Sequence, residues 1–280
     1  MNHLAVPTRS RARTLYRRAQ INRWFGRHSV AADLCRRALD VCDYYKAYEL
    51  LARLVLHGED YIQVLQQVHE HLKPETYVEI GVSRGTSFRL VGPRTRAVGI
   101  DPSPQLNLDA LAPQQKVFVQ TSDDFFAQHD LIAELGGQRV RMAFIDGMHH
   151  FEFALRDFAN LEPLCHPDSV IFIHDCYPLD ARSAARERTT RFWSGDVWRL
   201  IVLLKKYRPD LQVHTIATSP TGLGMITGLD PTSQVLKEKL PVLIEEGLAM
   251  DLNVIAQRRA EALNLFPNEW GRVRGVLDGR

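Results

Sequence analysis

Two segments of the chain each join an apolar run to an acidic residue with a histidine nearby. Residues 142–150 read MAFIDGMHH and residues 170–178 read VIFIHDCYP. Each apolar run predicts a buried strand, so Asp146 and Asp175 lie where two strands finish. Because ligands of open α/β sheets bind outside the carboxyl ends of the strands, we expect these two carboxylates to converge on one site. The histidines near them are His149, His150 and His174.

Two aspartates at such a place could hold a metal ion. Hard divalent cations such as magnesium prefer oxygen ligands and keep several waters, which leaves room for substrate oxygens. A bound cation lowers the pKa of a coordinated hydroxyl, so that its oxygen becomes nucleophilic at neutral pH. We therefore predict Asp146 and Asp175 as metal ligands. The structural alternatives are a turn cap for Asp175 and a hydrogen-bonded core position for His174.

A glycine-bearing turn precedes these segments. Residues 77–87 read YVEIGVSRGTS, which predicts a strand, a turn and a helix start, and the strand at 97–101 ends in Asp101. This arrangement places a nucleotide-like ligand against the turn and its ribose against the acid. The spacing is not that of a dinucleotide site, however, because Ser83 stands at the middle glycine position between Gly81 and Gly85.

The pattern E-x-G-x-x-x-G, followed by a strand that ends in aspartate, resembles the S-adenosylmethionine (SAM) site of class I methyltransferases. SAM has no phosphate, so the missing glycine matters less than it would for a dinucleotide. The plain structural alternative is a strand, turn and helix whose glycines serve only the turn. Ser122 also fits an N-cap for the helix that follows it. The resemblance implies that SAM binds to Glu79, Gly81, Ser83, Gly85, Asp101, Ser122 and Asp123.

From Thr76 onward, short β-rich runs alternate with helical stretches, which predicts βαβ units and a mainly parallel sheet. Only five residues separate the last two runs, 211–217 and 223–227, so these must form an antiparallel hairpin. Five parallel strands closed by a hairpin resemble the Rossmann-like, seven-stranded α/β sheet of class I methyltransferases. The other strands are expected at 76–81, 97–101, 116–120, 141–146 and 169–174. Helices are expected at 87–91, 105–111, 123–135, 151–164 and about 197–207.

Three regions are predicted along the chain. Residues 1–73 form a helical N-terminal cap, residues 74–230 the SAM-dependent methyltransferase domain, and residues 231–280 a helical C-terminal extension. The first 37 residues contain nine arginines and a single acid, Asp33. Such a composition fits a transit peptide, an anion-binding arm or a solvated helix face.

The overall composition excludes several classes of protein. The formal net charge of +2 gives no overall reason to expect a nucleic-acid or anionic-membrane partner. No apolar run reaches 18 residues, so no membrane span is expected. The four cysteines show no C-x-x-C pair, which is typical of a reducing, cytoplasmic protein. The sequence does not decide whether the chain forms a homo-oligomer.

A narrower resemblance rests on residues 144–149, on Asp157 in the following helix and on residues 173–175. These look like macrocin-type sugar O-methyltransferases and cephalosporin-hydroxylase-like proteins, whose usual run is I-D-G-D-H-x-Y-E. The resemblance implies Asp146 and His149 as catalytic residues, with Asp146 and Asp175 as metal ligands. The chain departs from the family at three positions. These are Met148 for the second aspartate, Phe151 for the tyrosine, and Cys176 where metal-dependent relatives often have a third ligand.

The expected function is therefore SAM-dependent methyl transfer to a hydroxyl of a small molecule or a sugar or glycan precursor, with magnesium as a candidate second cofactor. Alternatives are a hydroxylase-like enzyme on the same fold and a catalytically silent SAM-fold protein that acts as a scaffold. The segment 180–198 carries two tryptophans and four arginines. It would overhang the acceptor pocket and grip a sugar or an anion, or alternatively cap the next helix and pack Trp198 on the sheet.

Overall fold

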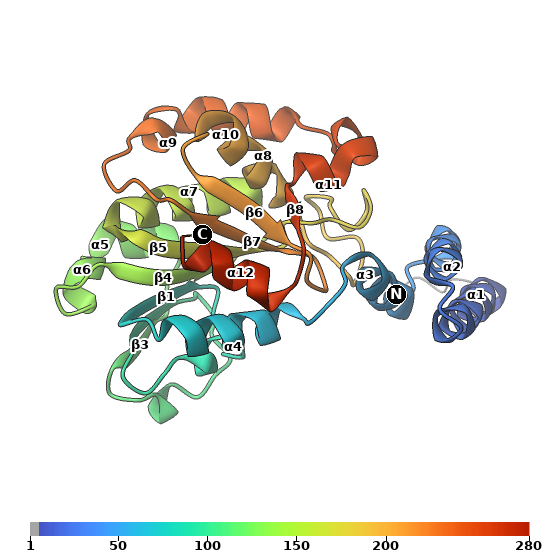
Figure 1. Ribbon diagram of the computed structural model, residues 1–280, viewed down its shortest axis with the longest axis horizontal. Helices are drawn as coiled ribbons and strands as arrows, with labels where there is room; N and C mark the ends of the chain where they lie inside the picture. Colours follow the sequence, from blue (N-terminus) through green and yellow to red (C-terminus); the bar gives the residue numbers. More distant parts are fainter. Residues whose placement is uncertain (1–5, 280) are drawn as a thin grey trace.

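The computed structural model describes residues 6–279, which form one mixed sheet with helices around it (Figure 1). The strand order is β3-β2-β1-β4-β5-β7-β6-β8. The strands are β1 (Thr76–Ile80), β2 (Arg96–Ile100), β3 (Gln115–Phe118), β4 (Val140–Ile145), β5 (Cys165–His174), β6 (Gln212–Ile216), β7 (Leu223–Thr227) and β8 (Leu265–Phe266). Strands β1 to β5 are parallel to their neighbours in this group. The expected Rossmann-like methyltransferase sheet is confirmed.

The antiparallel hairpin is also confirmed, since β7 pairs in an antiparallel manner with both β5 and β6. One strand was not expected. The two-residue strand β8 comes from the C-terminal extension and pairs in parallel with β6, which makes the sheet eight-stranded. A strand of two residues is too short to leave an alternating pattern in the sequence.

Helices cover both faces of the sheet because alternate residues of each strand point to opposite sides. On one face, Tyr77 packs with residues of α4 and α12, and on the other Val78 packs with residues of α5 to α10. None of the described helices is long and apolar enough to cross a membrane. The helices of the two faces and of the C-terminal extension are α4 (Tyr61–Leu72), α5 (Ser122–Gln128), α6 (Leu131–Glu134), α7 (Phe151–Leu161), α8 (Trp198–Tyr207), α9 (Val235–Glu238), α10 (Leu240–Ala249), α11 (Arg259–Ala262) and α12 (Trp270–Leu277).

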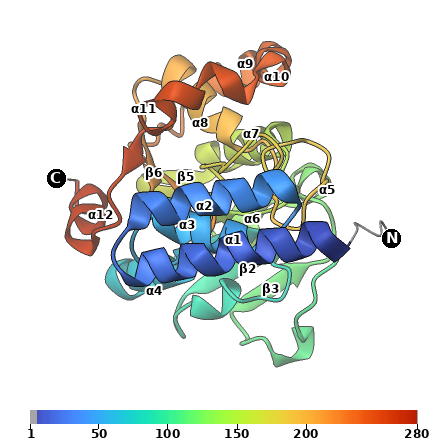
Figure 2. The ribbon, with the colours of Figure 1, turned by 90° about the vertical axis from the view of Figure 1, so that its right-hand side faces the viewer.

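The first three helices, α1 (Val6–Trp24), α2 (His28–Val41) and α3 (Tyr45–Val55), form a layer with its own apolar cluster. They lie beyond the end of the sheet toward which β6 points (Figure 1), and α1 and α2 lie side by side in front of that end (Figure 2). Since β6 runs parallel to β5, this is the carboxyl edge of the parallel strands.

The loop after β5 connects this layer to the sheet. The ring of Tyr48 in α3 stacks on that of Phe192 with centroids 4.9 Å apart. The Tyr48 hydroxyl donates a hydrogen bond to Asp180 at 2.7 Å. The helical layer is therefore fixed to the same loop that borders the ends of β4 and β5.

The prediction of helices at 87–91 and 105–111 was wrong. Each contains only a three-residue 3₁₀ turn, η1 (Phe88–Leu90) and η2 (Leu108–Ala110). Prolines stand close to both turns and cannot supply the N–H groups that a longer helix needs. The helix expected at 123–135 is divided into α5 and α6, because Asp130 caps a new helix with its side chain.

Candidate active site

A pocket of about 370 Å³ opens at the carboxyl ends of β1, β2 and β4. This volume is within the range of sites for cofactors and small molecules. The pocket brings together five of the seven residues predicted for SAM, and the predicted catalytic pair Asp146 and His149 forms part of the same wall. The five are Gly81, Ser83, Asp101, Ser122 and Asp123.

The turn between β1 and η1 is tied to the end of β2 through Asp101. The backbone N–H of Ser83 donates to one carboxylate oxygen at 2.7 Å, and that of Ser103 donates to the other at 2.7 Å. Ser83 adopts a left-handed backbone with φ of 48°, which turns its N–H toward the acid. Each carboxylate oxygen has a second lone pair, so Asp101 retains acceptor capacity for the hydroxyls of a ribose.

The two glycines of the turn have different roles. Gly81 has φ of +90°, and a Cβ at this position would overlap the backbone oxygen of Asp146. Glycine is therefore required for β1 to pass close to the loop after β4. Gly85 has φ of +70° and donates its N–H to Val82 at 2.8 Å, so it shapes the turn without lining the pocket.

Glu79 lies beneath the turn, outside the pocket. Its carboxyl group is fully buried and accepts hydrogen bonds from the hydroxyls of Tyr77 at 2.6 Å and Ser87 at 2.7 Å. Burial raises the pKa of Glu79 to about 8, although both hydroxyls favour the charged form. The residue therefore supports the turn from inside the protein, where it does not contact a ligand in the pocket.

This raised pKa predicts a specific pH dependence of stability. Between the ordinary carboxyl pKa of 4.5 and about 8, Glu79 is protonated in the folded chain and ionised in the unfolded one. The unfolded state then binds fewer protons, so Glu79 lowers the free energy of unfolding as pH rises through this window, by on the order of 3 kcal/mol. Glu79→Gln stays neutral and should lack this loss. Urea unfolding of both proteins at pH 5 and pH 8 measures it, and equal pH dependence would contradict the prediction.

The start of α5 forms another wall of the pocket. The N-cap is Thr121, whose hydroxyl accepts from the N–H of Asp124 at 3.1 Å, and the prediction of Ser122 as N-cap was wrong by one residue. In α7, burial raises the pKa of Asp157 to about 7, although its interaction with Ser122 favours the charged form. Asp123 accepts two hydrogen bonds from Arg156, at 3.0 and 2.7 Å.

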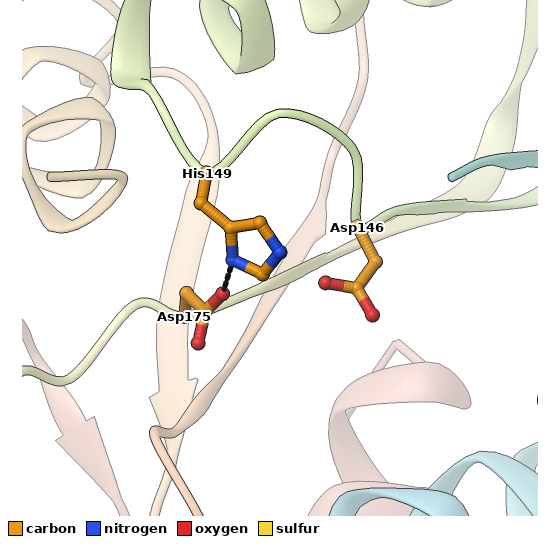
Figure 3. A group of neighbouring side chains, drawn as sticks. All are labelled: Asp146, His149 and Asp175. Carbon is orange, nitrogen blue, oxygen red and sulfur yellow. Dashed lines mark hydrogen bonds and ion pairs between the residues drawn. The ribbon is translucent and has the colours of Figure 1, made fainter. Parts of the chain in front are cut away.

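Asp146, His149 and Asp175 meet at the edge of this pocket (Figure 3). His149 Nδ1 forms a hydrogen bond with Asp175 Oδ2, and the hydroxyl of Thr221 donates to the other oxygen of Asp175 at 2.6 Å. The second ring nitrogen of His149, Nε2, has no hydrogen bond within residues 6–279 and points toward Asp146 (Figure 3). The imidazole is therefore held from one side by a buried carboxylate and is free on the other.

The backbone at this centre is strained. His149 and Asp175 both have left-handed conformations, with φ of 56° and 62°. Such conformations are unfavourable for residues other than glycine and are found most often at functional sites. The pKa of His149 is raised: burial opposes the charge, but the charge of Asp175 and its hydrogen bond outweigh burial.

A second histidine–aspartate pair lies behind the first. His174 Nδ1 is 3.1 Å from Asp146 Oδ1, and the ring of Tyr61 lies 4.1 Å from that of His174, centroid to centroid. Burial lowers the pKa of His174, but Asp146 and Asp175 outweigh it and raise the value to about 9. Cys176 supplies no third ligand, because its Sγ donates to the backbone oxygen of Ile173 at 3.3 Å.

The donor atoms of Asp146, His149 and Asp175 all lie within 4.8 Å of one another. The group combines two carboxylate oxygens with one imidazole nitrogen, a donor set that suits a divalent cation with mixed oxygen and nitrogen ligation. The residues therefore fit a metal ion. The sequence analysis placed Asp146 and Asp175 together, and the structure adds His149 as a third candidate ligand.

The sequence analysis missed the role of Asp196, which links the loop after β5 to the start of α7. It is fully buried and accepts from the N–H of Phe151 at 2.9 Å, so it caps α7 from a distant part of the chain. Arg186 and Arg199 neutralise it at 2.7 and 2.6 Å. The position of this acid between two tryptophans could have marked it as a buried residue. Its partner at the start of α7 is 45 residues away, so the sequence does not show their contact.

Two neighbours of Asp196 hold the loop that carries His149. Gly195 has φ of +60°, and a Cβ there would overlap the backbone oxygen of His149. The ring of Trp193 lies 5.3 Å from the His149 ring, and its indole N–H donates to Ala185 at 2.6 Å. Trp198 is buried in the core, as the structural alternative predicted, but the cap that the same alternative expected for the next helix is wrong, because no side chain caps α8.

The sheet with its terminal hairpin, the glycine turn and the strand-end acid define a class of protein, the SAM-dependent methyltransferases. Comparison with protein families agrees, since residues 78–176 match the model described as a methyltransferase domain. The chain therefore contains a methyltransferase domain over these residues. No curated protein matches it in sequence.

Several solved structures are similar in fold. The O-methyltransferase TomG from Streptomyces achromogenes, in complex with SAM, has 18% identity and a TM-score of 0.47 over 60% of this chain and 79% of that one. An O-methyltransferase from Bacillus cereus, in complex with SAH, has 16% identity and a TM-score of 0.44 over 69% and 96%. MycE, in complex with Mg and SAH, has 15% identity and a TM-score of 0.42 over 61% and 50%. Similarity this distant identifies neither the acceptor nor a metal requirement of this chain.

Proposed function

We propose that the chain transfers the methyl group of SAM to a hydroxyl oxygen of a small molecule or of a sugar or glycan precursor. The observation that carries this proposal is the position of His149. Its ring lines the cofactor-sized pocket and is held by the buried carboxylate of Asp175. A base next to a methyl donor is what an O-methyltransferase needs, because a neutral hydroxyl is a weak nucleophile.

In the proposed reaction, SAM lies in the pocket with its ribose on Asp101 and its methionine part beside Gly81 and Ser83. The acceptor hydroxyl lies next to His149 Nε2. As the oxygen attacks the methyl carbon, the C–S bond breaks, and His149 takes the hydroxyl proton. Asp175 keeps the proton of the imidazole on Nδ1 and stabilises the imidazolium that forms. Because the sulfonium is already an activated donor, holding the two reactants in line supplies much of the acceleration.

A divalent cation such as magnesium is part of the proposal as an assistant. Asp146 and Asp175 would hold it, because their donor atoms lie within 4.8 Å of each other and His149 Nε2 must stay free as the base. When bound, it would lower the pKa of the acceptor hydroxyl. Without it, Asp146 still faces His149 Nε2, and its negative charge favours the imidazolium that forms when His149 takes the proton.

Calorimetric titration with SAM tests the cofactor half of this proposal. Asp101→Ala should weaken SAM binding at least about tenfold, because it removes the ribose acceptor and the two hydrogen bonds that tie the turn to β2. Asp109→Ala, an exposed acid in η2, is the matched control and should bind like the wild type. Absence of SAM binding by the wild type, or unchanged binding by Asp101→Ala, would contradict the assignment. Iron- and oxygen-dependent turnover without SAM would support the hydroxylase-like alternative instead.

A further inference from the structure

A second concave site lies between the helical layer and the loop after β5. It is a groove of about 850 Å³ to which α1, the start of α3 and the loop contribute. Its lining contains four cationic side chains and one acid. The cations are Arg9, Arg13, Lys46 and Arg191, and the acid is Asp43.

These four cations differ from the other basic residues around the active site. Arg156, Arg186 and Arg199 each bind a carboxylate within 2.7 Å. Within residues 6–279, none of the four groove cations forms an ion pair, and Asp43 is engaged by the backbone N–H of Arg191 at 3.0 Å. Four exposed cations that converge on a hollow with a single acid leave a net positive charge, which forms an electrostatic site for an anion.

The loop that borders the groove also contacts the active site. Arg191 lies over the ring of Tyr45 on the groove side, at 4.6 Å from the ring centroid. On the other side of the loop, the guanidinium of Arg188 lies 5.7 Å from the centroid of Trp193, whose ring is 5.3 Å from that of His149. The helical layer lies beyond the carboxyl edge of the strands (Figures 1 and 2), which is the edge at which the pocket opens.

The charge of α1 and α2 also favours an anionic ligand. Residues 6–41 carry nine arginines, Asp33 and Asp40, a formal charge of +7, which leaves −5 for the rest of the chain. All nine arginines are exposed. A concentrated positive field beside a cleft raises the local concentration of anionic substrates.

We propose that this groove binds a phosphate-type anion carried by the methyl acceptor, so that the substrate is a phosphorylated or diphosphate-linked hydroxyl compound. The inference rests on the proposed function and names its substrate class. Guanidinium groups suit this ligand because they bind phosphate oxygens in pairs. The anion is held by Arg9, Arg13, Lys46 and Arg191, while the hydroxyl reaches His149 past Trp193.

Titration of the full chain with inorganic pyrophosphate, in metal-free buffer at low salt, tests this site. The wild type should bind pyrophosphate, and the double variant Arg13→Gln/Arg191→Gln should bind it at least tenfold more weakly. The matched control is Arg11→Gln/Arg37→Gln, which removes the same charge from the same layer outside the groove and should change affinity less than twofold. If the Arg191 variant does not fold, Arg13→Gln/Lys46→Gln replaces it.

Either of two pyrophosphate results overturns the inference: no binding by the wild type, or equal loss of affinity in the two double variants. A duplex DNA that binds and is weakened equally by both variants would assign the arginines to a diffuse nucleic-acid surface and also overturn it. SAM titration of the same proteins separates this inference from the proposed function. Intact SAM binding without pyrophosphate binding would contradict the anion site alone. Absence of SAM binding would contradict the proposed function.

Discussion

His149→Ala is expected to reduce the rate of methyl transfer by about 10²–10³-fold, which is within the range that one general base contributes. The imidazole is the group that joins the cofactor pocket to a buried carboxylate, and alanine leaves no base in its place. The rate is measured as radiolabelled methyl transfer from SAM to an acceptor selected from a panel of sugars, sugar phosphates and phenols. SAM affinity should stay within about threefold, because the ribose-binding end of the pocket is unchanged.

The neighbouring residue supplies the control for this experiment. His150 lies next to His149, but its ring faces the backbone oxygen of Arg186 at 3.1 Å. His150→Gln should therefore retain most of the rate. Asp175→Asn should lose nearly as much rate as His149→Ala, because it removes the charge that orients and stabilises the imidazole. If His149→Ala keeps its rate within tenfold of the wild type, another group removes the proton and the proposed base is wrong.

The approach of Asp146, His149 and Asp175 could be predicted from sequence, because parallel strands end at a common edge and both aspartates follow apolar runs. Their pairing could not. His149 and Asp175 pair while both residues adopt left-handed backbone conformations. The loop of His149 is also in close contact with Gly195, which is distant in the sequence. An apolar pattern reports which face of a strand is buried and contains no information on such loop conformations.

Glu79 shows a second limit of sequence motifs. Its spacing from Gly81 suggested a cofactor ligand, yet the period of two along a strand puts it on the same face as Tyr77, under the turn. The motif located the turn correctly, while the position of this carboxyl group follows from strand geometry. The antiparallel pairing of β6 and β7 was predictable for a different reason: the five residues between the expected runs 211–217 and 223–227 permit only a hairpin.

Gly81→Ala is expected to destabilise the protein by at least about 2 kcal/mol more than Gly137→Ala. Both glycines have positive φ, +90° and +84°, so alanine carries a similar backbone cost at each. They differ in what a Cβ would meet. At Gly81 it overlaps the backbone oxygen of Asp146, whereas at Gly137 nothing lies within 4 Å. The difference between the two variants therefore isolates the close approach between the glycine turn and the loop after β4.

Urea unfolding followed by tryptophan fluorescence measures both variants, and equal losses of stability would show that backbone conformation alone requires Gly81. Relief of the overlap must move either the turn or Asp146, and both line the pocket. Gly81→Ala should therefore also weaken SAM binding under conditions in which it remains folded, whereas Gly137→Ala should not. This coupling explains why a glycine that offers no side chain to a ligand occupies the junction between the turn after β1 and the loop that carries Asp146.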